Sequence, residues 1–163
     1  MNYSIRPATI ADLPRILEIY EDARAFMRRT GNPNQWWDYH PAESILREDI
    51  PKRQLYVCEQ GGNIGAVFAY IQGTDPTYLV IDGDGWLNDD PYGVIHRIAV
   101  AHRGQGLIAH IFDWALQQCP NLRIDTHRDN APMQRALEKY GFQYCGIIHI
   151  LNGDERIAFH KCI

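Results

Sequence analysis

The sequence predicts an α/β protein with a mixed, mostly antiparallel central sheet flanked by helices. Its 163 residues suit one domain, residues 1–163, that is large enough to bury its own core. Hydrophobic residues make up 45% of the chain and charged residues 22%, an ordinary globular balance. Apolar runs typical of strands alternate with amphipathic helical runs, in the order β-α-α-β-β-β-α-β-α-β-β. This order is typical of a sheet with helices on its faces.

The chain is expected to open with a short strand and a long helix. Residues 3–8 predict the strand. Residues 9–31 predict an amphipathic helix, because their apolar side chains recur at the i, i+3, i+4, i+7 spacing. Thr9 and Asp12 resemble a capping box at its start, and Gly31 is expected to end it.

A second helix and a hairpin are expected next. Residues 42–50 predict a short helix closed by Pro51. Residues 54–60 and 64–73 predict two strands, and Gly61-Gly62-Asn63 between them is a hairpin signal.

The remaining elements are expected to alternate and then end in a hairpin. They are a central strand at 93–100, a helix at about 104–118, a strand at 122–127, a helix from 130 to about 140, and strands at 142–150 and 155–163. Asn130 is a good N-cap and Gly141 a good helix stop. Asn152-Gly153 favours a tight type I′ turn.

Charge, hydropathy and cysteine spacing exclude several classes of protein. A net charge of -4 and a pI of about 5.9 argue against a nucleic-acid partner, which needs a clustered basic face. No apolar run approaches the roughly 18 residues of a membrane span, and the N-terminus lacks an apolar signal core. No pair of cysteines has the C-x-x-C spacing, so packed thiols in a reducing cytoplasm are expected, with no metal site. The cysteines are Cys58, Cys119, Cys145 and Cys162.

Two glycines at the start of a predicted helix indicate an anion site. Arg103-Gly104-Gln105-Gly106 follow the central strand and open the helix at about 104–118. The first turn of a helix has N–H groups without partners, and the helix dipole makes that end positive. A phosphate there would meet several donors, and Arg103 would add a charge-assisted contact. The alternative is a tight strand-to-helix turn with close packing. A P-loop is excluded because no Gly-Lys-Ser/Thr follows, and a dinucleotide fold lacks its third glycine.

The segments around these glycines resemble the GNAT superfamily of N-acetyltransferases. "IHRIAVAHRGQGLIAHIFDWAL" carries the family's R/Q-x-x-G-x-G/A pattern at Arg103 and Gly106, and "LRIDTHRDNAPMQRALEKYGF" carries its "N…GF" segment from Asn130 to Phe142. The element order fits over essentially the full chain. Two positions depart from the pattern: Ile108 stands where the family has Gly or Ala. The frequent tyrosine four residues before the glycine of "GF" is Leu137 here.

The resemblance implies acetyl-CoA as co-substrate, bound where the fourth and fifth strands splay apart. The backbone of Ile98, Ala99 and Val100 would pair with the pantetheine arm, and Asn130 would lie near that arm. The residues implied to hold the pyrophosphate are Arg103, Gly104, Gln105, Gly106, Leu107 and Ile108.

Direct attack of an amine on the thioester needs a base for the amine and an acid for the thiolate. His96 is the preferred base, because it lies two residues before the proposed cofactor segment and its ordinary titration range suits neutral pH. The alternative is a strand histidine that only packs against a neighbour. Tyr140 is a candidate acid, although a tyrosine at a helix end usually only packs.

The acceptor pocket is expected between the aromatic loop 32–41 and the acidic loop 82–93. Trp36, Trp37 and Trp86 would wall an amine-bearing substrate, and Asp82 with its neighbouring aspartates would attract the cation. Alternatively, the tryptophans cover the core and the aspartates serve turns.

The leading hypothesis is an acetyl-CoA-dependent N-acetyltransferase acting on a primary amine of a small molecule or peptide. The alternative is a non-catalytic acyl-CoA-binding sensor with the same fold, which Leu137 keeps open. A third possibility is an unrelated α/β binding domain without affinity for coenzyme A. The last strand would allow a homodimer.

Overall fold

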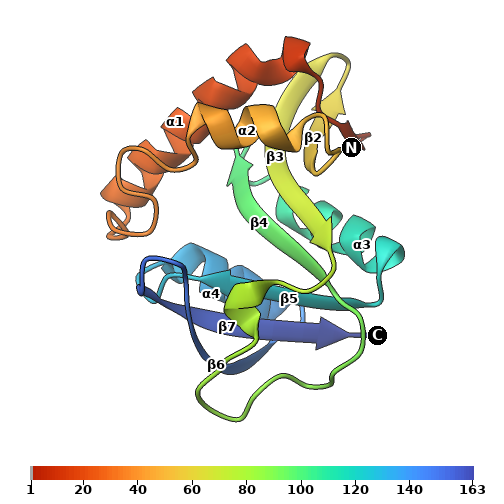
Figure 1. The fold of residues 1–163 in the computed structure, drawn as a ribbon. Coiled ribbons are helices and arrows are strands. Elements are labelled where there is room, and N and C mark those ends of the chain that lie inside the picture. The colour runs from red at the N-terminus through yellow and green to blue at the C-terminus, as the bar shows by residue number, and fades with distance from the viewer. Residues whose placement is uncertain (1) are drawn as a thin grey trace.

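The computed structural model describes residues 2–163, and within them seven strands form one sheet in the order β1-β2-β3-β4-β5-β7-β6 (Figure 1). Every neighbouring pair is antiparallel except β4 and β5, which are parallel. The strands are β1 Ser4–Pro7, β2 Leu55–Gln60, β3 Asn63–Gln72, β4 Gly93–Val100, β5 Asn121–Thr126, β6 Gln143–His149 and β7 Glu155–Cys162. The helices are α1 Leu13–Arg29, α2 Glu43–Asp49, α3 Leu107–Gln118 and α4 Ala131–Lys139, with 3-10 turns η1 Ile10–Asp12 and η2 Pro76–Tyr78. The predicted mixed, mostly antiparallel sheet flanked by helices is confirmed.

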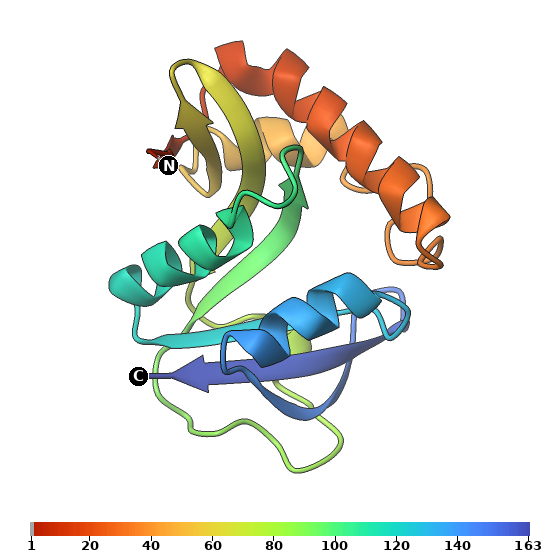
Figure 2. The ribbon, with the colours of Figure 1, turned by 180° about the vertical axis from the view of Figure 1, so that it is seen from behind.

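The helices cover opposite faces of the sheet, as the two ribbon views show (Figures 1 and 2). Helices α1 and α2 pack on one face through a core that includes Ile16, Leu46 and Val67. Helices α3 and α4 pack on the other face, where Phe68 and Ile111 are completely buried. Neighbouring residues of β3 therefore point into different cores, as the period of a strand requires. This arrangement leaves the middle of the sheet buried on both sides.

Strand β4 changes its side-chain alternation halfway along its length. Val67 of β3 pairs with Ala99 and Ala69 pairs with His96, so Arg97 and Ile98 together face one residue of β3. This is a β-bulge, and Arg97 adopts a left-handed φ of 53° within it. Ile95 and Ala99 are four positions apart, a spacing that places two residues of a regular strand on the same face. Because the extra residue shifts the period, they lie in different cores. The bulge thus sets where the side chains around His96 point.

Strands β4 and β5 separate soon after they meet. Their parallel pairing joins only Gly93 to Leu122 and Val94 to Arg123. The two strands then diverge, as both ribbon views show (Figures 1 and 2). The β5-facing edge of β4 from Ile95 onward therefore has no strand partner in residues 2–163, which leaves backbone groups free for another extended chain.

Most local signals are confirmed, and two expectations are wrong. Asn130 caps α4, since its side chain accepts a hydrogen bond from Met133 N. Helix α3 begins at Leu107 rather than near residue 104, because the glycines before it have left-handed φ values that no α-helix accommodates. The turn at Asn152-Gly153 is not type I′, because only Gly153 has positive φ. Gly153 N donates to Ile150 O at 2.8 Å, as in a three-residue loop whose last residue is left-handed.

All four cysteines are free, and burial raises the pKa of the Cys58 thiol to about 12. None of the helices in residues 2–163 has the length and apolar character needed to cross a membrane.

Candidate active site

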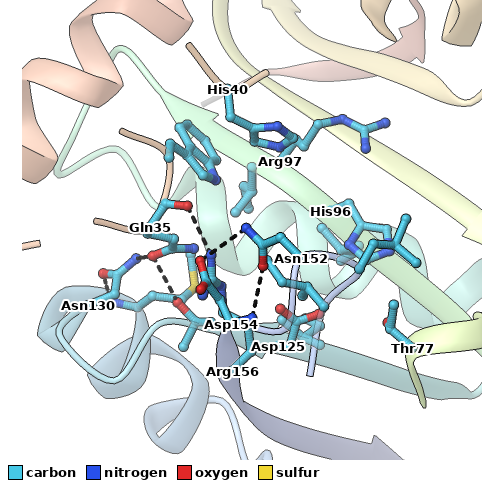
Figure 3. Close-up of a pocket in the computed structure, with 18 of the residues that line it drawn as sticks. Gln35, His40, Thr77, His96, Arg97, Asp125, Asn130, Asn152, Asp154 and Arg156 are labelled. Carbon is cyan, nitrogen blue, oxygen red and sulfur yellow. Dashed lines mark hydrogen bonds between the residues drawn. The ribbon is translucent and has the colours of Figure 1, made fainter. Parts of the chain in front are cut away.

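A cavity of about 500 Å³ opens beside β4. Its wall comes from the loop that follows α1, from η2, from β4 and β5, and from the β6–β7 turn (Figure 3). Trp36 and Trp37, expected to wall an acceptor pocket, and His96, expected to be the base, all line this cavity. Trp36 is buried against Tyr20, whereas the Trp37 side chain is half exposed at the mouth.

His96 is held by a carboxylate that the sequence analysis missed. Its Nε2 lies 2.9 Å from Asp75 Oδ2, and the two side chains are 26% and 16% exposed. Asp75 also accepts hydrogen bonds from Thr77 N at 2.9 Å and Thr77 Oγ1 at 2.7 Å. Burial opposes ionisation of Asp75, but the bonds from His96 and Thr77 outweigh it and lower its pKa to about 2. With this carboxylate ionised, neutral His96 carries its proton on Nε2, and Nδ1 is the nitrogen left to accept one.

The bulge that orients His96 is itself anchored by buried polar groups. Arg97 forms an ion pair with Asp49 of α2, and Tyr20 of α1 donates a hydrogen bond to Arg97 O at 2.7 Å. Burial raises the pKa of the Tyr20 hydroxyl, so the group stays a neutral donor. These contacts secure a left-handed residue that would otherwise be strained. Neither Asp49 nor Arg97 carries a sequence signal that identifies this role.

A second cavity of about 350 Å³ lies on the other side of β4, between that strand, the N-terminus of α3 and α4. All the predicted cofactor residues except Gln105 line this cavity. They are Ile98, Ala99, Val100, Arg103, Gly104, Gly106, Leu107, Ile108 and Asn130. Tyr140 also lines this second cavity, where its ring packs edge-on against Phe112 at 5.9 Å. Leu137, by contrast, is fully buried in the core.

The glycines at the mouth of α3 adopt left-handed conformations. Gly104 has φ of 77° and Gly106 has φ of 69°, and a Cβ built on either would meet no heavy atom within 4 Å. Backbone in such conformations forms concavities that bind anions, and the open space leaves room for one. Arg103 stacks over the Phe26 ring at 3.6 Å, and burial, reinforced by Arg29, lowers its pKa. The segment therefore combines exposed backbone with a cation that is held by an aromatic ring.

The two cavities meet at four residues, Met27, Ile98, Asn130 and Met133. Gln35, which the sequence analysis also missed, ties the aromatic loop to this junction. Its Oε1 accepts a hydrogen bond from Asn130 Nδ2 at 2.9 Å (Figure 3). It also accepts one from Asn32 Nδ2 at 2.8 Å. The two cavities are therefore neighbours along β4.

Trp86 and Asp82 lie outside both cavities, which corrects the expected second wall of the acceptor pocket. Trp86 packs on Tyr78 at 5.0 Å and donates from Nε1 to Tyr78 O at 2.9 Å. Asp82 forms a backbone bridge to Ile147 of β6, with N–O distances of 2.9 and 2.8 Å. The acidic loop therefore covers β6 and a small core, while η2 supplies the wall that the loop was expected to form.

Comparison with known proteins decides the family. The family model described as acetyltransferase (GNAT) domain matches residues 3–143. The chain belongs to the GNAT acetyltransferase family. Like other GNAT proteins, it is an N-acetyltransferase that takes its acyl group from acyl-CoA.

Solved GNAT structures share the fold over nearly the whole chain. A GNAT-family acetyltransferase from Streptococcus agalactiae is 32% identical, with a TM-score of 0.89, over 99% of this chain and 95% of that one. A GNAT-family acetyltransferase from Listeria monocytogenes is 20% identical, with a TM-score of 0.73 over 99% and 95%. A ribosomal-protein-alanine N-acetyltransferase from Brucella melitensis is 20% identical, with a TM-score of 0.63 over 98% and 99%. The last two comparisons show the fold alone. No curated protein matches the sequence.

Proposed function

We propose that this protein transfers an acetyl group from acetyl-CoA directly to a primary amine of a small molecule or peptide. The observation that carries the proposal is the meeting of two cavities at Ile98. One contains a histidine paired with a carboxylate, and the other ends at the glycine-rich mouth of a helix. A donor and an acceptor bound on the two sides would bring their reacting ends together at β4.

The groove beside β4 fits the donor. The free edge of Ile98, Ala99 and Val100 would hold the pantetheine arm as an added strand, with Asn130 nearby. The backbone of residues 103–108 would hold the diphosphate, and Arg103 would add a positive charge. Ile108 faces this groove where many GNAT proteins have glycine or alanine, so the diphosphate would sit against a larger side chain.

His96 would serve as the base on the acceptor side. Its Nδ1 would take a proton from the incoming ammonium, and Asp75 would stabilise the resulting imidazolium. When bound, acetyl-CoA supplies the thioester whose C–S bond breaks as the amine nitrogen forms the new C–N bond. Tyr140 lines the donor groove and is the candidate that would return a proton to the thiolate sulfur.

Release of free thiol from acetyl-CoA across a panel of amines tests the proposal. Amine-dependent thiol release is the expected result, together with a heat of association for coenzyme A in calorimetry. Binding of coenzyme A without turnover on any amine would instead favour an acyl-CoA sensor. A folded sample that shows no heat with coenzyme A would refute both functions.

A further inference from the structure

One buried arginine of the acceptor cavity has no acidic partner. Arg156 is the second residue of β7, is only 6% exposed, and lines the 500 Å³ cavity that His96 also lines (Figure 3). Its guanidinium donates to Gln35 O at 3.0 Å and to Glu155 O at 2.9 Å. Among residues 2–163 no carboxylate lies within 4.0 Å of it. Two carbonyl dipoles are a weak match for a full charge removed from water.

The other arginine that lines this cavity and the other buried arginine are both compensated, which makes Arg156 unusual. Arg97 is paired with Asp49. Arg123 lies between two aromatic faces, 4.4 Å from Trp86 and 4.0 Å from Tyr92, and lines neither cavity. Arg156 has neither kind of partner, and burial lowers its pKa.

The carboxylates that act on Arg156 from a distance are already engaged. Asp125 accepts the Tyr78 hydroxyl at 2.7 Å, and Asp154 accepts Asn152 Nδ2 at 3.1 Å. Both stabilise the charged guanidinium through space without forming an ion pair. Asp154 and Asn152 are exposed residues of the β6–β7 turn.

His40 lines the same cavity and adds no charge to it. Burial and nearby positive charge, chiefly that of Arg97 and Arg156, lower the pKa of His40 to about 4. His40 is therefore neutral near pH 7. Arg97 is neutralised by Asp49, so Arg156 is the lining arginine whose charge stays available.

We infer that the acceptor carries an acidic group, a carboxylate, in addition to its reactive amine, and that Arg156 binds that group. The inference rests on the proposed function, because it places the amine beside His96 on β4 and the carboxylate at Arg156 on β7. The chemical class is a zwitterionic amine such as an amino acid. A guanidinium suits this role because its planar fork binds a carboxylate through two parallel hydrogen bonds.

The test compares each amino acid with its own carboxamide as acceptor, using α-, β- and γ-amino acids and acetyl-CoA. Wild-type protein should prefer at least one acid over its amide. Arg156→Gln should lower kcat/KM for that acid by about tenfold to hundredfold, the range for a lost charge-assisted hydrogen bond, and should change the amide by less than about twofold. Most of the loss should appear in KM, because the contact is the same in ground and transition states. Each kcat/KM is expressed per concentration of unprotonated amine, so that the different basicity of the two amines does not bias the wild-type comparison. The acid-to-amide ratio of kcat/KM is then compared between variants.

Two further variants separate recognition from folding. Arg156→Lys should keep part of the preference for the acid, because it keeps the charge without the fork. Arg128→Gln removes an exposed arginine outside both cavities and should change nothing. The melting temperature and the heat of coenzyme A binding, which uses the other cavity, report on folding. If Arg156→Gln does not fold, the acid-to-amide comparison in wild type still decides.

Equal or better activity on the amides in wild type, or an equal loss on acid and amide in Arg156→Gln, would overturn this inference and leave the proposed function standing. Absence of acetylation on every amine would overturn the proposed function, and this inference with it.

Discussion

Replacing Asp75 with asparagine removes the negative charge that lies 2.9 Å from His96 Nε2. The pKa of Asp75 is about 2 in the folded protein against 3.8 for a free aspartate. That difference corresponds to about 1–2 kcal/mol in favour of the folded state near pH 7, after allowance for the partial exposure of the pair. The lowered pKa means that this stability is present above pH 4 and is lost as the pH falls through 2.

The same substitution should reduce catalysis. Asparagine keeps a hydrogen-bond acceptor near His96 but no longer stabilises the imidazolium that forms when the base takes a proton. We expect kcat/KM to fall by at least about tenfold, a part of the 10²–10⁴-fold that a general base contributes. Because Asp75 does not line the cavity proposed to bind coenzyme A, the affinity for coenzyme A should not change.

Thermal melts from pH 2 to 8 and thiol-release kinetics measure the two effects. The melting temperature of Asp75→Asn should lie about 2–8 °C below wild type at pH 7, and the gap should close near pH 2. Asp82→Asn, an exposed aspartate outside both cavities, is the matched control and should behave as wild type. If Asp75→Asn keeps the wild-type kcat/KM, the assignment of Asp75 as the group that supports His96 as base is refuted. If the difference in melting temperature between wild type and Asp75→Asn stays constant down to pH 2, the electrostatic account of stability is refuted.

Three other predictions follow from the site. His96→Gln should lower kcat/KM by about 10²–10⁴-fold across pH 6–9 with unchanged coenzyme A binding, and retention of full activity would remove His96 as the base. Gly106→Ala should destabilise the fold by about 1–2 kcal/mol, because alanine is strained at φ of 69°. It should also weaken coenzyme A binding in calorimetry, and unchanged affinity would contradict the anion site. Trp86→Phe should lower the melting temperature, since the hydrogen bond from the indole N–H to Tyr78 O is lost. The KM for the acceptor should stay constant, and a raised KM would indicate that Trp86 contacts the acceptor.

Sequence patterns within a single element, such as apolar runs and capping residues, account for the predictions that the structure confirms. The strand at 93–100 has the bounds expected from its apolar run, and Asn130 caps α4 through its own side chain. Such features depend on contacts between residues a few positions apart, so a single stretch of sequence contains the information. The residues expected to hold the cofactor line one cavity for the same reason, because the glycines, the strand and the helix that contribute to it are consecutive in the chain.

The acceptor side could not be predicted in this way. His96 is paired with Asp75, 21 positions away, and Gln35 contacts Asn130 across 95 positions. The acidic loop was expected to line the pocket, yet its Asp82 bridges to β6 and its Trp86 packs on Tyr78. Nothing in the spacing of these residues shows which strands lie next to each other.

The sequence by itself determined the order of helices and strands and, through the motif around Arg103 and Gly106, the family to which the chain belongs. Only the tertiary structure decided that Arg97 bulges out of β4, that β4 and β5 separate after two residue pairs, and that Arg156 is buried without an acid. The physical reason is that elements form from local periodicity and capping, whereas pairing of charges depends on which elements pack together. One extra residue in β4 reversed the alternation that its sequence suggests, and so determined which side chains face the acceptor.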